Sequence, residues 1–271
     1  MFRLTGRALV VGVTGPPGAG KSSLVDRLVA LRRAAGERVA VVAVDPSSPV
    51  SGGAVLGDRV RMQGHALDPG VFIRSMATRG HHGGLARATV GAVRVLDAAG
   101  WPLVLIETVG AGQVEIDVAH ASDTTVVVVP PGLGDSVQAA KAGLLEVADV
   151  FVVNKADLPG ADQVVRDLQA LGDRPVVRTI ATKDEGIDAL WEAIAGHPRS
   201  DERRAAQLTA EVRRLVEDAA AAAAWRRAQG PALEDALHEI AARRLDPLSA
   251  AAQIMGDAPG NVPKARPQPR Q

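Results

Sequence analysis

The first 180 residues alternate short valine-rich runs with longer segments rich in alanine and leucine. The runs are apolar throughout rather than at every second residue, which is typical of strands covered on both faces of a sheet. Repeated strand–helix units predict an α/β fold, a doubly wound, mostly parallel sheet flanked by helices, with ligands bound where strands end. We expect strands at residues 9–13, 39–44, 71–74, 103–106, 125–129, 150–153 and 176–180, and helices at 22–35, 84–99, 136–147 and 161–171.

Strand signals stop after residue 198, and helical patterns follow. One apolar helix face is marked by Leu208, Val212, Leu215 and Val216. After Gly230 and Pro231 a second helix is expected, with Leu233, Leu237, Ile240, Ala241 and Leu245 on one face, and a third over 248–255. These apolar stripes need a partner, either the main domain or another copy of the chain. We therefore predict a domain over 1–198, a helical arm over 199–257 and a disordered tail over 258–271.

Composition excludes several function classes. The 31 Lys and Arg residues balance 31 Asp and Glu residues, whereas a nucleic-acid binder needs a basic excess. The absence of cysteine excludes disulfides, thiolate metal ligands and a cysteine nucleophile. The apolar residues 8–13 follow two arginines, but they are interpreted as a strand rather than part of a signal peptide. No run approaches the roughly 18 apolar residues of a membrane span, so we expect a cytoplasmic protein.

A glycine-rich segment between the first strand and the first helix fits the pattern G-x-x-x-x-G-K-[ST]. Glycines let backbone N–H groups converge on phosphate oxygens, and the helix N-terminus adds partial positive charge. Lys21 is expected to reach the β- and γ-phosphates, and Ser22 to bind Mg²⁺. The residues predicted to hold the phosphates are Gly15, Pro16, Gly18, Ala19, Gly20, Lys21, Ser22 and Ser23.

The sequence Asn-Lys-Ala-Asp at residues 154–157 follows the strand expected at 150–153 and matches the N-K-x-D pattern of GTPases. Asp157 can accept hydrogen bonds from guanine N1–H and the 2-amino group, whereas adenine has no donors at those edges. Asn154 is expected to brace the loop and Lys155 to lie along the base. The backbone around Ala181 and Thr182 is expected to contact guanine O6. These residues favour GTP over ATP, although a four-residue pattern alone could simply cap the next helix.

Acidic residues end two of the expected strands. Asp45 follows 39–44, and Glu107 follows 103–106 and opens Glu-Thr-Val-Gly, a variant of the D-x-x-G motif. Here the carboxylate works near Mg²⁺ or its waters while the amide of Gly110 senses the γ-phosphate. The expected catalytic set is Lys21, Asp45, Glu107 and Gly110; the expected metal set is Ser22, Asp45, Asp58 and Glu107. Either strand-end acid could instead act as a cap.

Five sequence strings, at 44–49, 56–62, 75–81, 107–113 and 131–135, together resemble the MeaB/ArgK family of P-loop GTPases, which belong to the SIMIBI class. The resemblance runs from about residue 10 to 191, and more loosely through the helical C-terminus. It implies a GTPase chaperone that gates adenosylcobalamin delivery to, and protection of, an acyl-CoA mutase, typically methylmalonyl-CoA mutase. It also implies a homodimer through the C-terminal helices and a switch loop that relays nucleotide state through Asp135, Gln138 and Lys141.

The chain departs from the family pattern at its start. Family members usually carry a helical extension before the first strand, and here only about seven residues precede it, which leaves the nucleotide site intact but puts in question the partner contacts made by that extension. His82 occupies a position where an apolar residue is expected. No residue is a convincing general base, so we expect slow intrinsic hydrolysis that rises when the mutase orders the switch loops.

Three other functions are kept as alternatives. Related GTPases insert nickel, but His81 and His82 form the only histidine cluster in the sequence, and adjacent side chains make a poor metal site. An older interpretation of the family is an ATP-dependent kinase linked to basic amino-acid transport, which the N-K-x-D motif opposes. A non-enzymatic helical scaffold is disfavoured by the phosphate loop.

Overall fold

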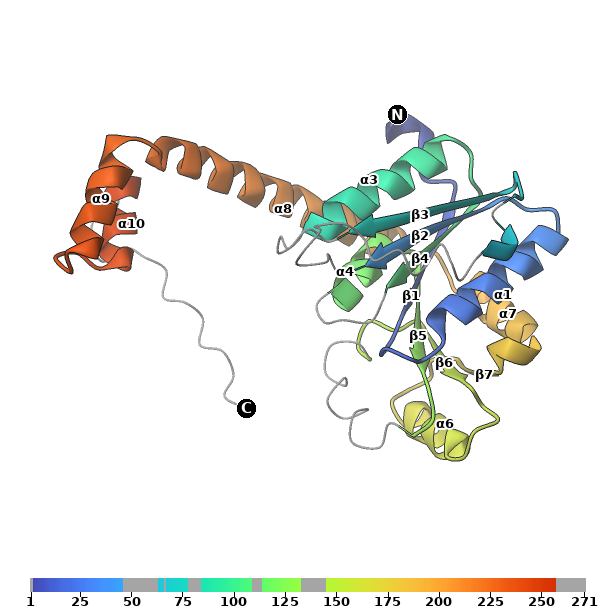
Figure 1. Ribbon diagram of the computed structural model, residues 1–271. Coiled ribbons are helices and arrows are strands. Elements are labelled where there is room, and N and C mark those ends of the chain that lie inside the picture. Colours follow the sequence, from blue (N-terminus) through green and yellow to red (C-terminus); the bar gives the residue numbers. More distant parts are fainter. Residues whose placement is uncertain are drawn as a thin grey trace. The chain divides into compact units, whose positions relative to one another are not determined.

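The computed structural model describes residues 2–45, 63–65, 67–77, 84–108, 114–132 and 145–256. The chain divides into two compact units, Met1–Arg204 and Ala205–Gln271. In the first unit, helices cover both faces of one sheet (Figure 1). The α/β fold expected from the valine-rich runs is therefore confirmed.

The sheet has seven strands in the order β3-β2-β4-β1-β5-β6-β7, and every neighbouring pair is parallel. Their bounds are β1 Leu9–Thr14, β2 Val39–Asp45, β3 Val71–Ala77, β4 Leu103–Thr108, β5 Thr124–Val129, β6 Val150–Asn154 and β7 Val176–Thr179. After β1 the chain first builds β2, β3 and β4 on one side and then β5, β6 and β7 on the other. Such a reversal of strand order opens a crevice at the carboxyl ends of the central strands.

In the described part of the chain, five helices pack on this sheet: α1 Lys21–Ala34, α3 Gly84–Ala98, α4 Val114–Ala121, α6 Ala161–Gln169 and α7 Ile187–Gly196. Helices α4 and α7 were not expected from the sequence. Both are short, although α7 buries Ile187, Leu190 and Ile194 at helical spacing. The helix expected at 136–147 is wrong at its end, where residues 145–147 form a turn, and its residues 136–144 lie outside the described part of the chain.

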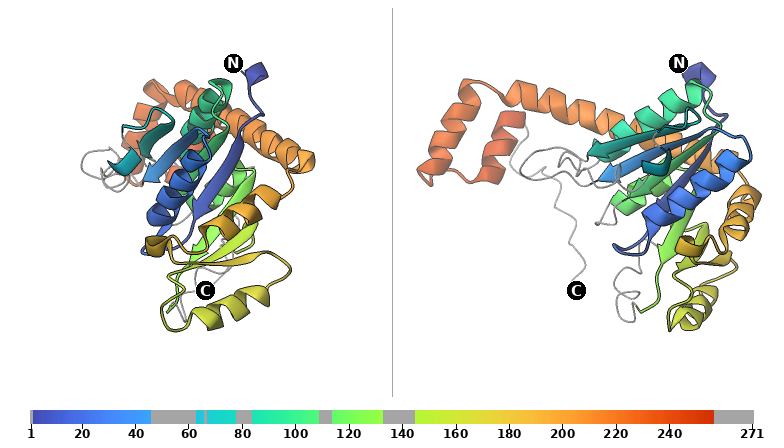
Figure 2. Two further views of the ribbon diagram at one scale, coloured as in Figure 1. Left: turned by 90° about the vertical axis from the view of Figure 1, so that its right-hand side faces the viewer. Right: turned by 45° about the vertical axis from the view of Figure 1, so that its right-hand side comes forward.

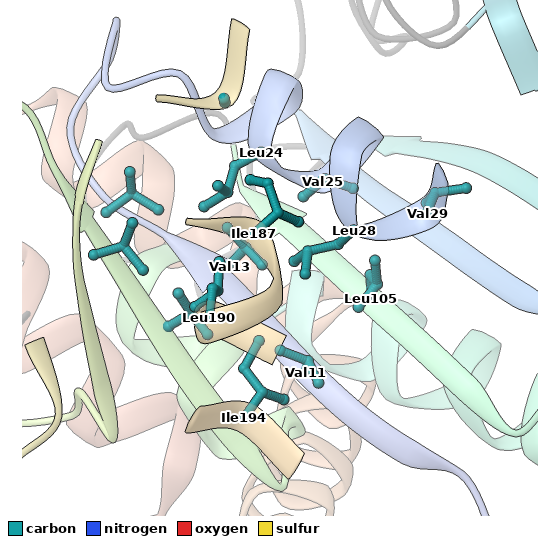
Figure 3. Packing of buried hydrophobic residues seen from close by; sticks show 14 of the residues in the cluster. Val11, Val13, Leu24, Val25, Leu28, Val29, Leu105, Ile187, Leu190 and Ile194 are labelled. Atoms are coloured by element: carbon teal, nitrogen blue, oxygen red, sulfur yellow. The ribbon is translucent and has the colours of Figure 1, made fainter. Parts of the chain in front are cut away.

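Successive residues along each strand point to opposite faces of the sheet, and each face is covered by an apolar layer. On one face, Val11 and Val13 of β1 and Leu105 of β4 pack with Leu24 and Leu28 of α1 and with Ile187, Leu190 and Ile194 of α7 (Figure 3). On the other face, the intervening residues Val10, Val42 and Val104 pack with Val93 and Leu96 of α3 and Val118 of α4. Burial of both faces explains why the strand sequences are apolar throughout.

Two aspartates fix the amino-terminal edge of the sheet to the start of α8 (Asp201–Ala228). Asp123 accepts a hydrogen bond from the Val10 N–H at 3.0 Å and pairs with Arg204 at 2.9 Å. Asp149 accepts one from the Thr125 N–H at 2.7 Å and pairs with Arg203 at 2.6 Å. The first turn of α8 is therefore held beneath β1 and β5, whose opposite ends carry the site described below.

The second unit contains the remainder of α8, together with α9 (Pro231–Ala241) and α10 (Pro247–Met255). Helices α9 and α10 lie side by side (Figure 2). With α8 they surround an apolar cavity of about 280 Å³, lined by residues that include Trp225, Leu233, Leu237 and Ile254. Within the described residues, no helix combines the length and apolar character needed to cross a bilayer. Residue 257 and the tail predicted at 258–271 lie outside the described residues.

Candidate functional site

The carboxyl ends of the central strands meet along one edge of the sheet. In register, Ala43 of β2 lies beside Glu107 of β4, Glu107 beside Val13 of β1, and Val13 beside Val126 of β5. The glycine-rich loop leaves β1 at this row, and Glu107 stands next to it. Two segments far apart in the sequence are thus brought together by strand pairing alone.

Two glycines of the loop occupy positions where no side chain fits. Gly15 has φ +139°, and a Cβ there would collide with the Val128 carbonyl oxygen of β5. Gly20 has φ +89°, and a Cβ there would collide with the Asn154 amide nitrogen. Both positive φ angles and both close approaches require glycine. The loop is therefore pressed against β5 on one side and against the end of β6 on the other.

The start of α1 is arranged to receive an anion. Its N-cap is Gly20, which has no side chain to cap the helix, and its first turn contains no acidic residue. The N–H groups of its first turn and the positive end of the helix dipole are thus directed at the loop. Lys21 is 6% exposed, and its Nζ donates to the carbonyl oxygens of Gly15 at 2.7 Å and Pro16 at 2.9 Å. The ammonium group therefore lies against the loop, on two of its carbonyl oxygens.

Ser22 and Glu107 form the second polar centre of the site. The Ser22 hydroxyl donates to Glu107 Oε1 at 2.5 Å, and Glu107 is only 2% exposed. A hydroxyl and a buried carboxylate are oxygen donors of the kind that Mg²⁺ prefers. Asp45 is the last residue of β2, paired in register with Ala77. Asp58 and Gly110 lie outside the described residues.

Asn154 connects the phosphate loop to the loop after β7. Its Nδ2 donates to the Ala19 carbonyl at 2.8 Å, while its Oδ1 accepts from the Thr179 hydroxyl at 3.0 Å and the Ala181 N–H at 3.2 Å. Asn154 is 2% exposed, so these contacts are sheltered from water. The side chain thus holds together the end of β6, the phosphate loop and the segment predicted to contact guanine O6.

Asp157 lies on the loop after β6 and contacts the segment that follows β7. Lys155 adopts φ +57° and turns the chain, and the Ala156 N–H donates to the Thr179 carbonyl at 3.1 Å. Lys183, at the end of the short 3-10 helix η3 (Ala181–Lys183), donates to Asp157 Oδ2 at 3.1 Å. This hydrogen bond holds the pKa of the Asp157 carboxyl below its ordinary value, so the group is ionised at neutral pH.

The structure brings together most of the predicted site residues, but not all of them fall within its described part. The phosphate loop, Glu107, Asn154, Lys155, Asp157, Ala181 and Thr182 converge at one end of the sheet. The predicted relay residues Asp135, Gln138 and Lys141, and also His82, lie outside the described residues. Lys183 was missed, although a lysine two residues after Ala181 is visible in the sequence.

Comparison with known proteins shows the family of this chain. Residues 1–229 match the model of the methylmalonyl Co-A mutase-associated GTPase MeaB. The chain belongs to this MeaB family. The GTPase ArgK of Escherichia coli is 39% identical over 70% of this chain and 61% of its own length. A Pyrococcus abyssi protein named as a GTPase is 47% identical over 96% of this chain and 86% of its own length. The chain is accordingly a GTPase and binds guanine nucleotides.

Solved structures agree on the fold. The crystal structure of a LAO/AO transport system kinase covers 94% of this chain and 82% of its own, with a TM-score of 0.63 and 26% identity. HypB from Helicobacter pylori, solved in complex with nickel, covers 72% of this MeaB-family chain and 91% of its own, with a TM-score of 0.53. At 17% identity that likeness shows a shared fold and nothing about nickel.

Replacing Asn154 tests how the site is held together. Asn154→Ala leaves a buried carbonyl and two buried donors without their partner, which costs about 1–3 kcal/mol of the free energy that holds the loops in their binding geometry. We expect guanosine-diphosphate affinity to fall by about five- to 150-fold, measured by fluorescence titration with a labelled nucleotide. Asn154→Asp keeps the acceptor for Thr179 and Ala181 but places a buried carboxylate oxygen against the Ala19 carbonyl oxygen, so it is expected to lose at least as much affinity as Asn154→Ala. Equal affinity in all three proteins would contradict the bracing role.

Proposed function

We propose that this chain is a Mg²⁺-dependent GTPase that gates delivery of adenosylcobalamin to an acyl-CoA mutase, such as methylmalonyl-CoA mutase, and protects that enzyme. The observation that carries the proposal is the match of residues 1–229 to a family named for its association with methylmalonyl-CoA mutase. A mouse relative named methylmalonic aciduria type A homolog, 38% identical over 68% of this chain and 48% of its own length, supports the same setting.

Hydrolysis on this site is a matter of positioning and charge. Water attacks the γ-phosphorus of GTP, the bond to the oxygen bridging the β-phosphate breaks, and GDP and inorganic phosphate are released. Negative charge on the phosphate oxygens would be stabilised by the Lys21 ammonium and by the loop amides, which the fold holds in place before substrate arrives. For this role Lys21 would exchange the carbonyl oxygens of Gly15 and Pro16 for phosphate oxygens.

The donor set beside the loop fits Mg²⁺. Ser22 and Glu107 already touch, and both offer oxygen atoms. We assign these two residues, with Asp45 and Asp58, to hold the ion and its waters. When bound, Mg²⁺ neutralises charge on the β- and γ-phosphate oxygens. Glu107 has a second function in this arrangement, since its carboxylate fixes the Ser22 hydroxyl at the start of α1.

Coupling to the mutase would run through segments that leave the strand ends. Gly110 follows β4 and would sense the γ-phosphate through its amide, while Asp135, Gln138 and Lys141 follow β5 and would report nucleotide state to the partner. Because these segments begin at the same edge of the sheet as the phosphate loop, a change at the γ-phosphate can reach both. Slow hydrolysis that a partner accelerates is the expected kinetic signature.

Adding the cognate mutase tests this coupling. We expect the rate of GTP hydrolysis to rise with mutase concentration and to saturate, because the partner orders the switch segments. Phosphate release is the readout, and Lys21→Ala is the control that removes the chain's own activity. A pull-down of the mutase should also differ between GDP and a non-hydrolysable GTP analogue. An unchanged rate at saturating mutase would rule out the coupling.

We also propose that the C-terminal helices form a homodimer. In α8 the residues Leu208, Val212, Leu215 and Val216 repeat at helical spacing and are 40–61% exposed. Helices α8, α9 and α10 add the apolar cavity described above. A stripe and a hollow of this kind leave apolar surface in water, and a second copy of the chain would cover it.

Charge placed on the stripe should separate the copies. The double variant Val212→Glu, Val216→Glu is expected to change the mass seen by light scattering from a dimer to the 28.0 kDa chain. Ala210→Glu, on the opposite side of α8, is the matched control and should leave the dimer intact. Nucleotide affinity should be the same in both variants. A wild-type chain of monomer mass would overturn the proposal.

A further inference from the structure

The two loops that form the guanine end of the site are joined by several contacts, and the Asp157–Lys183 pair is the most exposed of them. Asn154 accepts from Thr179 and Ala181 inside the protein, and the Ala156 N–H donates to the Thr179 carbonyl. Beyond these contacts, Lys183 Nζ lies 3.1 Å from Asp157 Oδ2, with side chains that are 53% and 38% exposed. The carboxylate assigned to read guanine therefore already holds a cation before any base is bound.

We propose that Lys183 is a specificity-determining positioning residue, which orients the Asp157 carboxylate for guanine and stays bonded to it when the base binds. The inference rests on the proposed role of Asp157 as the guanine reader. It assigns to Lys183 a contribution to base selection that the N-K-x-D motif does not include.

Guanine and Lys183 can use the same carboxylate at once. An ionised carboxylate has about four acceptor sites on its two oxygens. Lys183 takes one of them, so acceptor sites remain for guanine N1–H and the 2-amino group. Displacement of the lysine is unnecessary on these grounds.

Charge favours retention of the lysine. The guanine donors are neutral, so a base that covers Asp157 removes water from a full negative charge without supplying a positive one. Such desolvation is costly unless a cation remains nearby. The Lys183 ammonium provides that cation, and its hydrogen bond is the largest cause of the lowered pKa of Asp157.

The backbone around Lys183 fixes the position from which its side chain extends. Its N–H donates to the Ile180 carbonyl at 2.8 Å, and Asp184 follows in the left-handed region with φ +58°. Asp184 lies 3.3 Å from Arg27 of α1, the helix that opens at the phosphate loop. The segment that carries Lys183 is therefore tied to both the base-reading loop and the phosphate-binding helix.

The test compares two nucleotides that differ by one donor. Inosine diphosphate lacks the 2-amino group of guanosine diphosphate, so the ratio of their dissociation constants measures that group's hydrogen bond to Asp157. In Lys183→Met, which keeps an unbranched apolar chain without the charge, we expect guanosine-diphosphate affinity to fall and the ratio to shrink by up to about fivefold, the upper limit for an exposed ion pair. Lys183→Arg should restore most of the ratio.

Two further variants separate this inference from the proposed function. Arg178→Met breaks another exposed ion pair on β7, with Asp162, and is expected to leave the ratio unchanged. Asp157→Ala should bring the ratio of the two dissociation constants close to one. If the wild type itself fails to distinguish the two nucleotides, guanine reading by Asp157 is wrong. If Asp157→Ala brings the ratio close to one while Lys183→Met leaves it at the wild-type value or raises it, the role of Lys183 alone is overturned.

Discussion

The buried Asn154 side chain is the interaction on which this site depends. Strand pairing places Asn154 beside Thr179 in register, and its amide then reaches across to the phosphate loop. One side chain therefore sets the spacing between the loop predicted to hold the phosphates and the loops predicted to hold the base. Glycine is needed at residue 20 to make room for it, because a Cβ there would collide with the Asn154 amide nitrogen. The loop and the amide consequently constrain each other, and neither can shift without disturbing the other.

The chain carries no net charge, yet its site is suited to a highly charged ligand. Backbone amides, the start of α1 and the Lys21 ammonium gather at one end of the sheet, where glycine permits the chain to turn. Positive potential is thus a local property of folded backbone rather than of composition. At the opposite edge, Arg203 and Arg204 are neutralised by Asp149 and Asp123. The same strands, β1 and β5, join these two ends.

Much of this arrangement could be predicted from the sequence. The valine-rich runs indicate buried parallel strands because both faces are covered, and the predicted phosphate and base motifs fall at strand ends that pairing brings together. Helix α4 was missed because its eight residues give too short a pattern to separate from a loop. The Asp157–Lys183 contact depends on the turns after β6 and β7, where Lys155 and Asp184 respectively adopt positive φ, and hydrophobic periodicity does not predict such turns.

The most direct test of the account is a crystal structure of the chain with GDP and Mg²⁺. It is predicted to show the phosphates inside residues 15–22 with Lys21 Nζ turned toward them, the ion beside Ser22 and Glu107, and the guanine N1–H and 2-amino group on Asp157. Asn154 should keep its bonds to Ala19, Thr179 and Ala181. A base bound away from Asp157, or phosphates outside the loop, would contradict the account.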